Sequence, residues 1–226
     1  EIKKNSLIHF YLILILILLQ GFVGWYMVKS GLVERTDVSH YRLALHLILK
    51  FFIFILLLWN FLKYKNHQVS VQNKKLPINL PMIFMFFIIL QIIIGGFVSG
   101  LDAGKIYQTW PLMNQNYFPD DSNIKDLFTI KAFETASIVQ FIHRNLAYFI
   151  IILFGLIAAI VYGNKDFIYL RKITLMIFLF LFLQIFLGIL TILSGAQLII
   201  ASMHQIGSIL LITTSLILVF KNYRPN

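Results

Sequence analysis

The sequence predicts an all-α integral membrane protein with six transmembrane helices. Of its 226 residues, 59% are hydrophobic and 12% are charged, whereas a water-soluble domain usually carries about twice that charged fraction. Six apolar stretches are each long enough to cross a bilayer, for which a helix needs about 20 residues. The chain contains no cysteine, which excludes disulfides, iron–sulfur clusters and thiolate metal sites.

The expected helices cover residues 7–29, 42–62, 80–101, 138–162, 172–194 and 198–220. The first begins too far into the chain, and is too long and too polar near its end, to be a cleaved signal peptide. The first, third and fifth share the pattern Leu-Gln-x-x-x-Gly, beginning at Leu19, Leu90 and Leu183. The second, fourth and sixth return from these helices, and each has a histidine near its start. These histidines are His46, His143 and His204.

The segments between the helices divide the charges between two sides. The basic side holds Lys63, Lys65, Lys74, Lys75, Lys165, Arg171 and Lys172, and the termini add Lys3, Lys4, Lys221 and Arg224. The other side holds Glu34 and Asp37, and a long loop over 102–137 adds Asp102, Asp120, Asp121, Asp126 and Glu134. The positive-inside rule then places both termini on the cytoplasmic or matrix side. The net charge of +10 is therefore assigned to membrane topology and not to nucleic-acid binding.

The three histidines lie at one depth, roughly four to seven residues or about 6–10 Å inside the outer boundary. A single histidine in a membrane helix is often a hydrogen-bonding link between helices, but three at matched repeat positions indicate a site. The mid-membrane glutamines Gln20, Gln91 and Gln184 are interpreted as polar packing support. Gly95, Gly96 and Gly100 allow close approach of helices or of a flat ligand. His9, His40 and His67 do not fit the repeat.

Two histidines at one level, expected on neighbouring antiparallel helices, suit the iron of a haem held between them. Zinc would need three or four clustered ligands, which the spans lack. Arg144 follows His143 directly, and Arg42 lies one turn before His46. Both are candidates for pairing with haem propionates near the outer boundary. The alternative is that they extend to lipid phosphates.

Five segments together resemble the haem A synthase family, in its cysteine-free type. They are QGFVGWYMVKSGL (from Gln20), SHYRLALHL (from Ser39), GGFVSGLDAGKIYQTWPLM (from Gly95), VQFIHRNLAY (from Val139) and MHQIGSILL (from Met203). The resemblance implies two tandem four-helix bundles with eight spans. It implies a b-type haem between His143 and His204, and the substrate haem O bound in the N-terminal bundle through His46. It also implies an earlier span with a catalytic Glu-x-x-His-Arg motif.

The chain has six expected spans, so the resemblance implies that the first hairpin is missing and that the chain is a fragment or a shortened homologue. This interpretation agrees with a start at Glu1. Residues 76–226 are then expected to form a complete C-terminal b-haem bundle, and residues 1–75 half of the substrate bundle. The catalytic glutamate is not in the chain, so the chain alone is expected to bind haem without turnover unless a second chain complements it. Lys50, one turn deeper than His46, departs from the family pattern.

The activity implied by the resemblance is oxidation of a methyl group of haem O to the formyl group of haem A, for cytochrome oxidase. Implied partners are haem O, the enzyme that makes it, an electron donor and the lipid membrane, with a homo-oligomer or a complementing chain also considered. The location is a bacterial inner or mitochondrial inner membrane. A b-type cytochrome without haem-modifying chemistry is the alternative, and a transporter or scaffold is a third reading. In the outer loop, Trp110 and Tyr117 suit the membrane interface, and Asp102 and Lys105 are candidates for a salt bridge that fixes this cover.

Overall fold

The computed structural model describes residues 4–31, 38–65 and 74–223. Its long helices are α1 (Lys4–Gly31), α2 (His40–Lys65), α3 (Leu80–Gly100), α5 (Ala136–Gly163), α6 (Ile168–Leu193) and α7 (Leu198–Tyr223). All six are long and apolar enough to cross a membrane, so the expected helices are confirmed. Glu1, Lys3, Glu34, Asp37, His67 and Arg224 lie outside the described residues.

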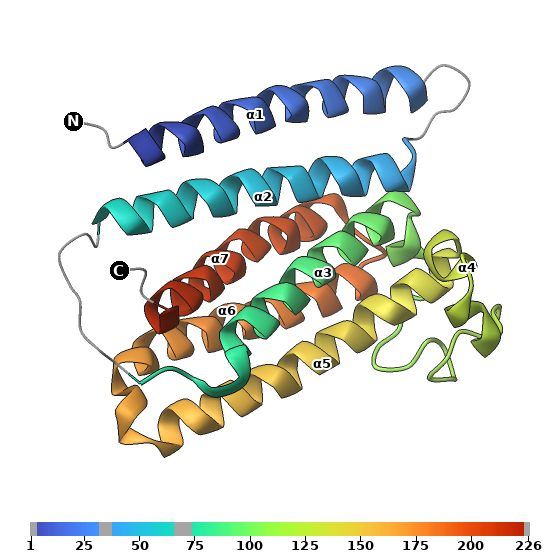
Figure 1. The fold of residues 1–226 in the computed structure, drawn as a ribbon. Coiled ribbons are helices and arrows are strands. Elements are labelled where there is room, and N and C mark those ends of the chain that lie inside the picture. The colour runs from blue at the N-terminus through green and yellow to red at the C-terminus, as the bar shows by residue number, and fades with distance from the viewer. Residues whose placement is uncertain (1–3, 32–37, 66–73, 224–226) are drawn as a thin grey trace.

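Four of the helices form a bundle. Helix α3 packs on α5 and α7, and α6 packs on the same two helices from the other side (Figure 1). Helix α2 lies against α3 and α7, while α1 packs on α2 and is outermost. Helices α1, α3 and α6 run in one direction and α2, α5 and α7 return (Figure 1). The sheet-free backbone of the described spans suits a bilayer, where every amide must be satisfied inside its own helix.

The bundle core fills the half nearer the basic end. Phe84 on α3, Ile157 on α5, Ile177 on α6 and Ile212 on α7 are all buried in one continuous cluster. In contrast, α1 leaves apolar side chains exposed on most of its surface, and among its described side chains only Ile13 and Val23 are buried. The packing therefore makes the four-helix bundle the rigid part of the chain.

Small residues set the contact between α2 and α3. A Cβ built on Gly96 would lie 3.1 Å from the Cα of Ala44, and one built on Gly100 would lie 2.6 Å from the Cα of His40. Alanine at position 100 would therefore collide with backbone and not with a movable side chain. The expectation that Gly96 and Gly100 allow two helices to approach closely is confirmed.

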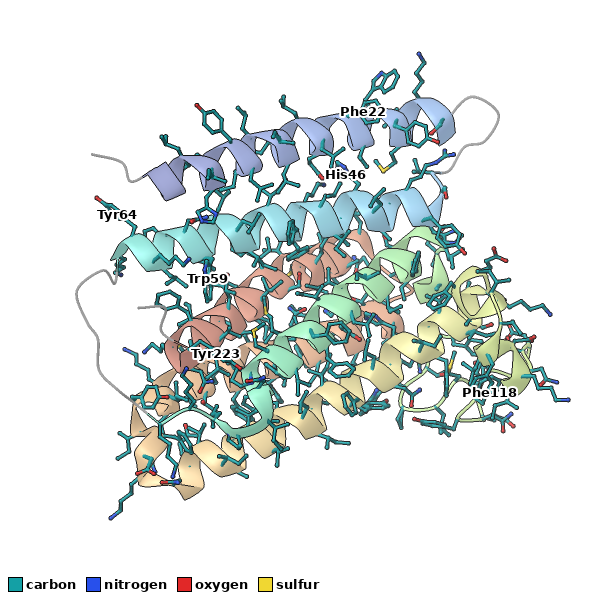
Figure 2. The ribbon with its side chains drawn as sticks, viewed as in Figure 1. Phe22, His46, Trp59, Tyr64, Phe118 and Tyr223 are labelled. Atoms are coloured by element: carbon teal, nitrogen blue, oxygen red, sulfur yellow. The ribbon has the colours of Figure 1, made fainter. Side chains whose placement is uncertain are left out.

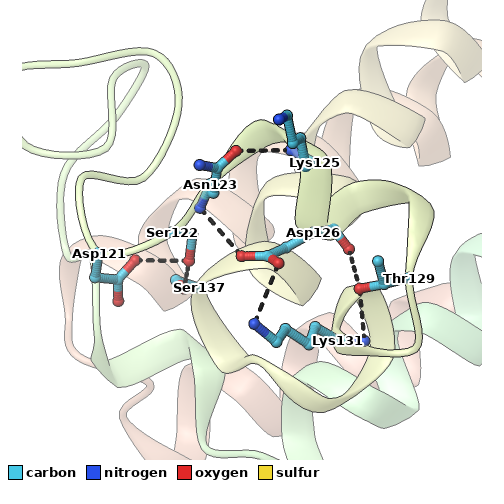
Figure 3. A network of polar contacts seen from close by, with 8 residues as sticks. All are labelled: Asp121, Ser122, Asn123, Lys125, Asp126, Thr129, Lys131 and Ser137. Carbon is cyan, nitrogen blue, oxygen red and sulfur yellow. Dashed lines mark hydrogen bonds and ion pairs between the residues drawn. The ribbon is translucent and has the colours of Figure 1, made fainter.

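The outer loop contains the short helices η2 (Ala103–Lys105), η3 (Ile124–Phe128) and α4 (Lys131–Glu134). Two further 3₁₀ turns, Pro77–Asn79 and Lys165–Phe167, precede α3 and α6 at the basic end. The loop is folded back on itself. A capping box joins Asn123 and Asp126, and Asp126 also pairs with Lys131 at 3.3 Å (Figure 3).

This loop is joined to the start of α5 and also contains an internal ion pair. Ser122 Oγ lies 2.9 Å from Ser137 Oγ at the start of α5 (Figure 3). The expected salt bridge between Asp102 and Lys105 is present at 2.8 Å, although both side chains are exposed and such pairs stabilise a fold by less than about 1 kcal/mol. Trp110 and Tyr117 are exposed, as expected for interfacial side chains.

Candidate functional site

The three Leu-Gln-x-x-x-Gly repeats each meet the histidine of the following long helix. In the first, Gln20 Nε2 lies 3.0 Å from Nδ1 of His46 and donates to the His46 carbonyl at 3.0 Å. A Cβ on Gly24 would lie 3.0 Å from Cε1 of the same ring. Figure 2 shows His46 in the space between α1 and α2. The histidine is therefore held by an amide and fitted against a glycine.

The second repeat has the same construction. Gln91 Nε2 lies 3.2 Å from Nε2 of His143 and donates to the His143 carbonyl at 3.1 Å. A Cβ on Gly95 would lie 3.3 Å from the ring Cε1. Since the glutamine and the glycine are four residues apart, they lie one above the other on the same face of α3.

In the third repeat the glycine still contacts the histidine ring, but the glutamine side chain does not bond to the histidine. A Cβ on Gly188 would lie 3.1 Å from Cε1 of His204. The buried Gln184 instead packs against Gly207, and its Nε2 has no hydrogen-bond partner. The structure thus brings each of the three glutamines to the helix that carries the histidine, but only Gln20 and Gln91 bond to the histidine through their side-chain amides.

Sequence reasoning did not assign a role to Gly24, Gly95 and Gly188 as contacts of the imidazole rings. The signal was present, because the repeat conserves the Gln–Gly spacing within this one chain. A side chain at these positions would occupy the space where the ring edge lies, so the glycine is required by close approach and not by backbone conformation.

The positions of His143 and His204 correct one expectation. We expected neighbouring antiparallel helices, but α5 and α7 run in the same direction and face each other diagonally across the bundle (Figure 1). The reason is that each histidine is on the returning helix of its own hairpin.

The chemistry of this pair fits an axial ligand set. The Nδ1 atoms of His143 and His204 are buried and have no hydrogen-bond partner among the described residues. Buried polar atoms are normally satisfied, and exceptions need an explanation such as an absent ion or ligand. Two imidazoles facing each other in a bundle core are a common arrangement for haem iron. His46 lies outside this bundle, against α1.

Arg144 is buried under the outer loop. Its Nη2 donates to the Tyr107 carbonyl at 3.0 Å and to Gln140 Oε1 at 3.2 Å, and its Nη1 donates to the Leu112 carbonyl at 3.2 Å. Its Nε atom has no partner. The structure therefore shows Arg144 as an anchor of the loop directly beside His143, with one nitrogen left for a further acceptor.

Gln140 completes this anchor, and sequence reasoning missed it. The side chain is 2% exposed, and its Nε2 donates to the carbonyls of Ala103 and Tyr107 at 2.9 and 3.1 Å. Its position one helical turn before Arg144 was the only available signal. Tyr107 is buried as well, and this burial raises the pKa of its phenol.

The other two charged candidates are on α2. Arg42 donates to Ser30 Oγ at 2.6 Å and stacks over the ring of Tyr26, so it links α2 to the outer end of α1. Lys50 is exposed and lines a groove between α2 and α7. The structure therefore places Lys50 toward α7, although it lies only one turn from His46.

Comparison with known proteins supports one family. Residues 1–216 match the model of a family described as cytochrome oxidase assembly protein. The chain is 44% identical over 214 residues to a heme A synthase of Pelagibacter ubique (strain HTCC1062), covering 94% of this chain and 62% of that protein. It is 39% identical over 221 residues to a heme A synthase of Wolbachia pipientis wMel, covering 96% and 60%.

A third relative is a heme A synthase of Rickettsia africae (strain ESF-5), 36% identical over 218 residues, covering 94% of this chain and 63% of that protein. The chain therefore spans about 60% of the length of the curated relatives it matches. These matches confirm the resemblance that the five segments predicted.

Proposed function

We propose that this chain, which belongs to the cytochrome oxidase assembly protein family together with the heme A synthases, takes part in the oxidation of haem O to haem A. In this reaction a methyl group of the macrocycle becomes a formyl group. The observation that carries the proposal is the pair of half-buried imidazoles of His143 and His204, each fitted against a glycine and each with a buried Nδ1 that has no partner among the described residues.

In this proposal the bundle of α3, α5, α6 and α7 is a b-type haem domain, corresponding to residues 76–226. His143 and His204 would be the residues that hold its iron. Haem b, when bound, would supply one-electron transfer to or from the reaction site. Gly95 and Gly188 leave room for the ring edges, because a Cβ at either position would lie 3.3 or 3.1 Å from the ring Cε1.

The outer loop closes the end of this domain. Tyr107 and Met113 of this loop are buried, and Arg144 and Gln140 hold the loop against α5. A closed outer edge excludes water, which strengthens electrostatic interactions inside the site. The free Nε of Arg144 is the group on this chain that we propose for contact with a haem propionate, and Arg42 has the same proposed role beside His46.

The substrate site is proposed beside His46 in residues 1–75. Gln20 fixes the imidazole against α1, and the ring would bind the iron of haem O and so orient the methyl group that reacts. The 226 residues contain no Glu-x-x-His-Arg motif, so the catalytic residue is not assigned. We propose that a preceding segment or a second chain supplies it, and a homo-oligomer is one form that such an assembly can take.

We also propose a respiratory membrane, bacterial inner or mitochondrial inner, with the basic ends of the helices on the cytoplasmic or matrix side. Lys63 and Lys65 are exposed in the last turn of α2 and Lys75 is exposed shortly before α3, and this end of α2 lies opposite the outer loop (Figure 1). Haem O and the enzyme that makes it are the proposed partners. The electron donor is not identified by these observations.

The test is a reduced-minus-oxidised spectrum and a pyridine haemochrome of the chain purified in detergent. We expect about one b-type haem per chain, lost in both His143→Ala and His204→Ala and retained in His46→Ala. The matched control is His9→Ala, an exposed histidine of α1. Absence of haem from the unchanged chain, or loss in His46→Ala alone, would contradict the proposed ligand pair.

A b-type cytochrome without haem-modifying chemistry is the second candidate. It is favoured by one observation: the four-helix bundle contains two of the repeat histidines, His143 and His204, while α2 carries His46 alone among them. Incubation with haem O, followed by chromatography of the extracted haem, separates the two functions. Formyl haem supports the synthase, and haem O recovered unchanged from a complemented, haem b-loaded preparation supports the cytochrome.

A further inference from the structure

Gln91 makes two contacts with His143 through one atom. Its side-chain nitrogen, Nε2, lies 3.2 Å from Nε2 of the imidazole ring and donates to the His143 carbonyl at 3.1 Å. The amide oxygen, Oε1, is buried and has no hydrogen-bond partner among the described residues. The amide is therefore held by its donor side alone, with one N–H on the carbonyl and the other on the ring.

This contact fixes the tautomer of the ring. An amide nitrogen can only donate, so Nε2 of His143 must supply the lone pair that accepts the hydrogen bond. A neutral imidazole has one N–H, which is then on Nδ1. A metal binds the neutral ring through a lone pair. In this tautomer the lone pair available to iron is therefore the one that the Gln91 amide already uses.

The bond between Gln91 and the ring is lost whichever ring nitrogen binds iron. If iron binds Nε2, it takes the lone pair that accepts from the amide. If iron binds Nδ1, the proton must move to Nε2, and two N–H donors then face each other. Turning the amide to bring Oε1 to the ring does not help, because Oε1 would then take the position 3.1 Å from the His143 carbonyl oxygen, where two acceptors would meet.

The other two repeats show that the amide contact is separate from the glycine contact. Gln20 Nε2 lies 3.0 Å from Nδ1 of His46 and donates to the His46 carbonyl at 3.0 Å, so the double contact recurs at a second histidine. Gln184 Nε2 has no partner, although Gly188 still meets the ring of His204. The third repeat therefore offers a matched control for the amide alone.

We propose that Gln91 is a positioning residue whose amide caps the ring of His143 before haem binds and is displaced from the ring when iron is bound. This inference rests on the proposed function, because it takes His143 as an iron ligand. The bond from Gln91 to the His143 carbonyl can be retained after the ring is released. A bond that exists only before ligation opposes ligation, so Gln91 lowers the affinity of the site for haem.

Replacing Gln91 with methionine, a side chain of similar length without the amide, tests this competition. The full chain is prepared without haem in lipid nanodiscs, and its affinity for ferric haem b is measured by competition with apomyoglobin. A typical hydrogen bond shifts an equilibrium about fivefold. We therefore expect Gln91→Met to bind haem about fivefold more tightly than the unchanged chain, whereas loss of a merely structural side chain would weaken binding or leave it unchanged.

The matched control is Gln184→Met, at the same position of the third repeat. Because Nε2 of Gln184 is not bonded to the His204 ring, we expect this variant to show no gain in haem affinity. The EPR spectrum of haem-loaded Gln91→Met should match that of the unchanged chain, since the amide no longer bonds to the ring once iron is bound. His143→Ala identifies the site by the loss of haem.

A second measurement does not depend on the folding of a Gln91 variant. In the ¹⁵N NMR spectrum of the haem-free chain with labelled histidine, the His143 signals are assigned by their loss in His143→Ala. We expect a protonated Nδ1 and an unprotonated Nε2. A proton on Nε2 would overturn the proposal, because Gln91 could not then donate to that atom.

Equal or weaker haem binding by a folded Gln91→Met chain, with haem still held through His143, would overturn this inference alone. An equal gain in Gln184→Met would also overturn it, because the gain would not come from the ring contact. Haem that is absent from the unchanged chain, or retained in His143→Ala, would instead overturn the proposed ligand pair and this inference with it.

Discussion

The role of Arg144 can be tested by replacing it with methionine. Arg144 is 6% exposed, and its guanidinium donates to the Tyr107 carbonyl, the Leu112 carbonyl and Gln140 Oε1. After the substitution, the Tyr107 carbonyl keeps Gln140 Nε2 at 3.1 Å and the Leu112 carbonyl keeps Thr109 Oγ1 at 2.9 Å. Gln140 Oε1 alone loses its partner.

The free-energy cost of Arg144→Met can be worked out from the hydrogen bonds that are lost and those that remain. A hydrogen bond from a charged donor contributes roughly 1.5–3 kcal/mol, and an orphaned buried acceptor costs about 1–3 kcal/mol. Removing a buried charge recovers part of this through relief of its desolvation. We therefore expect the attachment of the outer loop to weaken by about 2 kcal/mol, with the transmembrane helices unaffected.

Hydrogen exchange measures this loss directly. Local opening that becomes about 2 kcal/mol easier should raise the exchange rate of amides in residues 103–118 by about 30-fold. The matched control is Arg171→Met at the basic end, where the guanidinium donates to the exposed Tyr162 carbonyl at 3.1 Å. There we expect a change below about threefold near Tyr162 and none in the outer loop.

One result would refute the argument. If Arg144→Met leaves the exchange of residues 103–118 unchanged while bound haem is lost, the guanidinium does not anchor the loop, and its contact with a propionate is its main role. The opposite result, faster exchange with haem retained, would assign Arg144 to the loop alone.

Three other predictions concern two glycine contacts and the buried phenol of Tyr107. Gly188→Ala would place a Cβ 3.1 Å from Cε1 of His204 and should lower haem occupancy roughly tenfold, whereas Gly21→Ala, with no atom within 4 Å, should not change it. Gly100→Ala, with its Cβ 2.6 Å from the His40 backbone, should destabilise the fold by about 1–3 kcal/mol in denaturation measurements, while Gly155→Ala, with no atom within 4 Å, should be neutral or stabilising. Burial raises the pKa of Tyr107, so the folded state holds this proton more tightly than the unfolded state. Stability should therefore fall as pH rises through about 10, and Tyr107→Phe should reduce this dependence in an alkaline unfolding series.

The helices were predictable because length and hydropathy alone determine them in a membrane protein. The histidines were predictable because a repeat within the chain supplied the comparison that a single helix lacks. The diagonal relation of His143 and His204 was not predictable, because a repeat gives the depth of each histidine and the direction of its helix but does not show which helices touch. Nor were the partners of Arg144, because two of them are backbone carbonyls, and a carbonyl leaves no trace in residue identity.

Lys50 and His46 show that helical spacing alone does not determine which neighbouring helix a side chain contacts. Four residues apart, they lie on nearly the same stripe of α2, and from the sequence Lys50 is a departure from the family pattern one turn deeper than His46. However, α2 lies between α1 and α7, and the rotation of about 40° between positions four residues apart is enough to divide them. The His46 ring fits against Gly24 of α1, while Lys50 lines the groove with Gln205 of α7. A helix packed between two neighbours can thus present two side chains four residues apart to different helices. Helical spacing alone therefore does not show that His46 and Lys50 belong to one site.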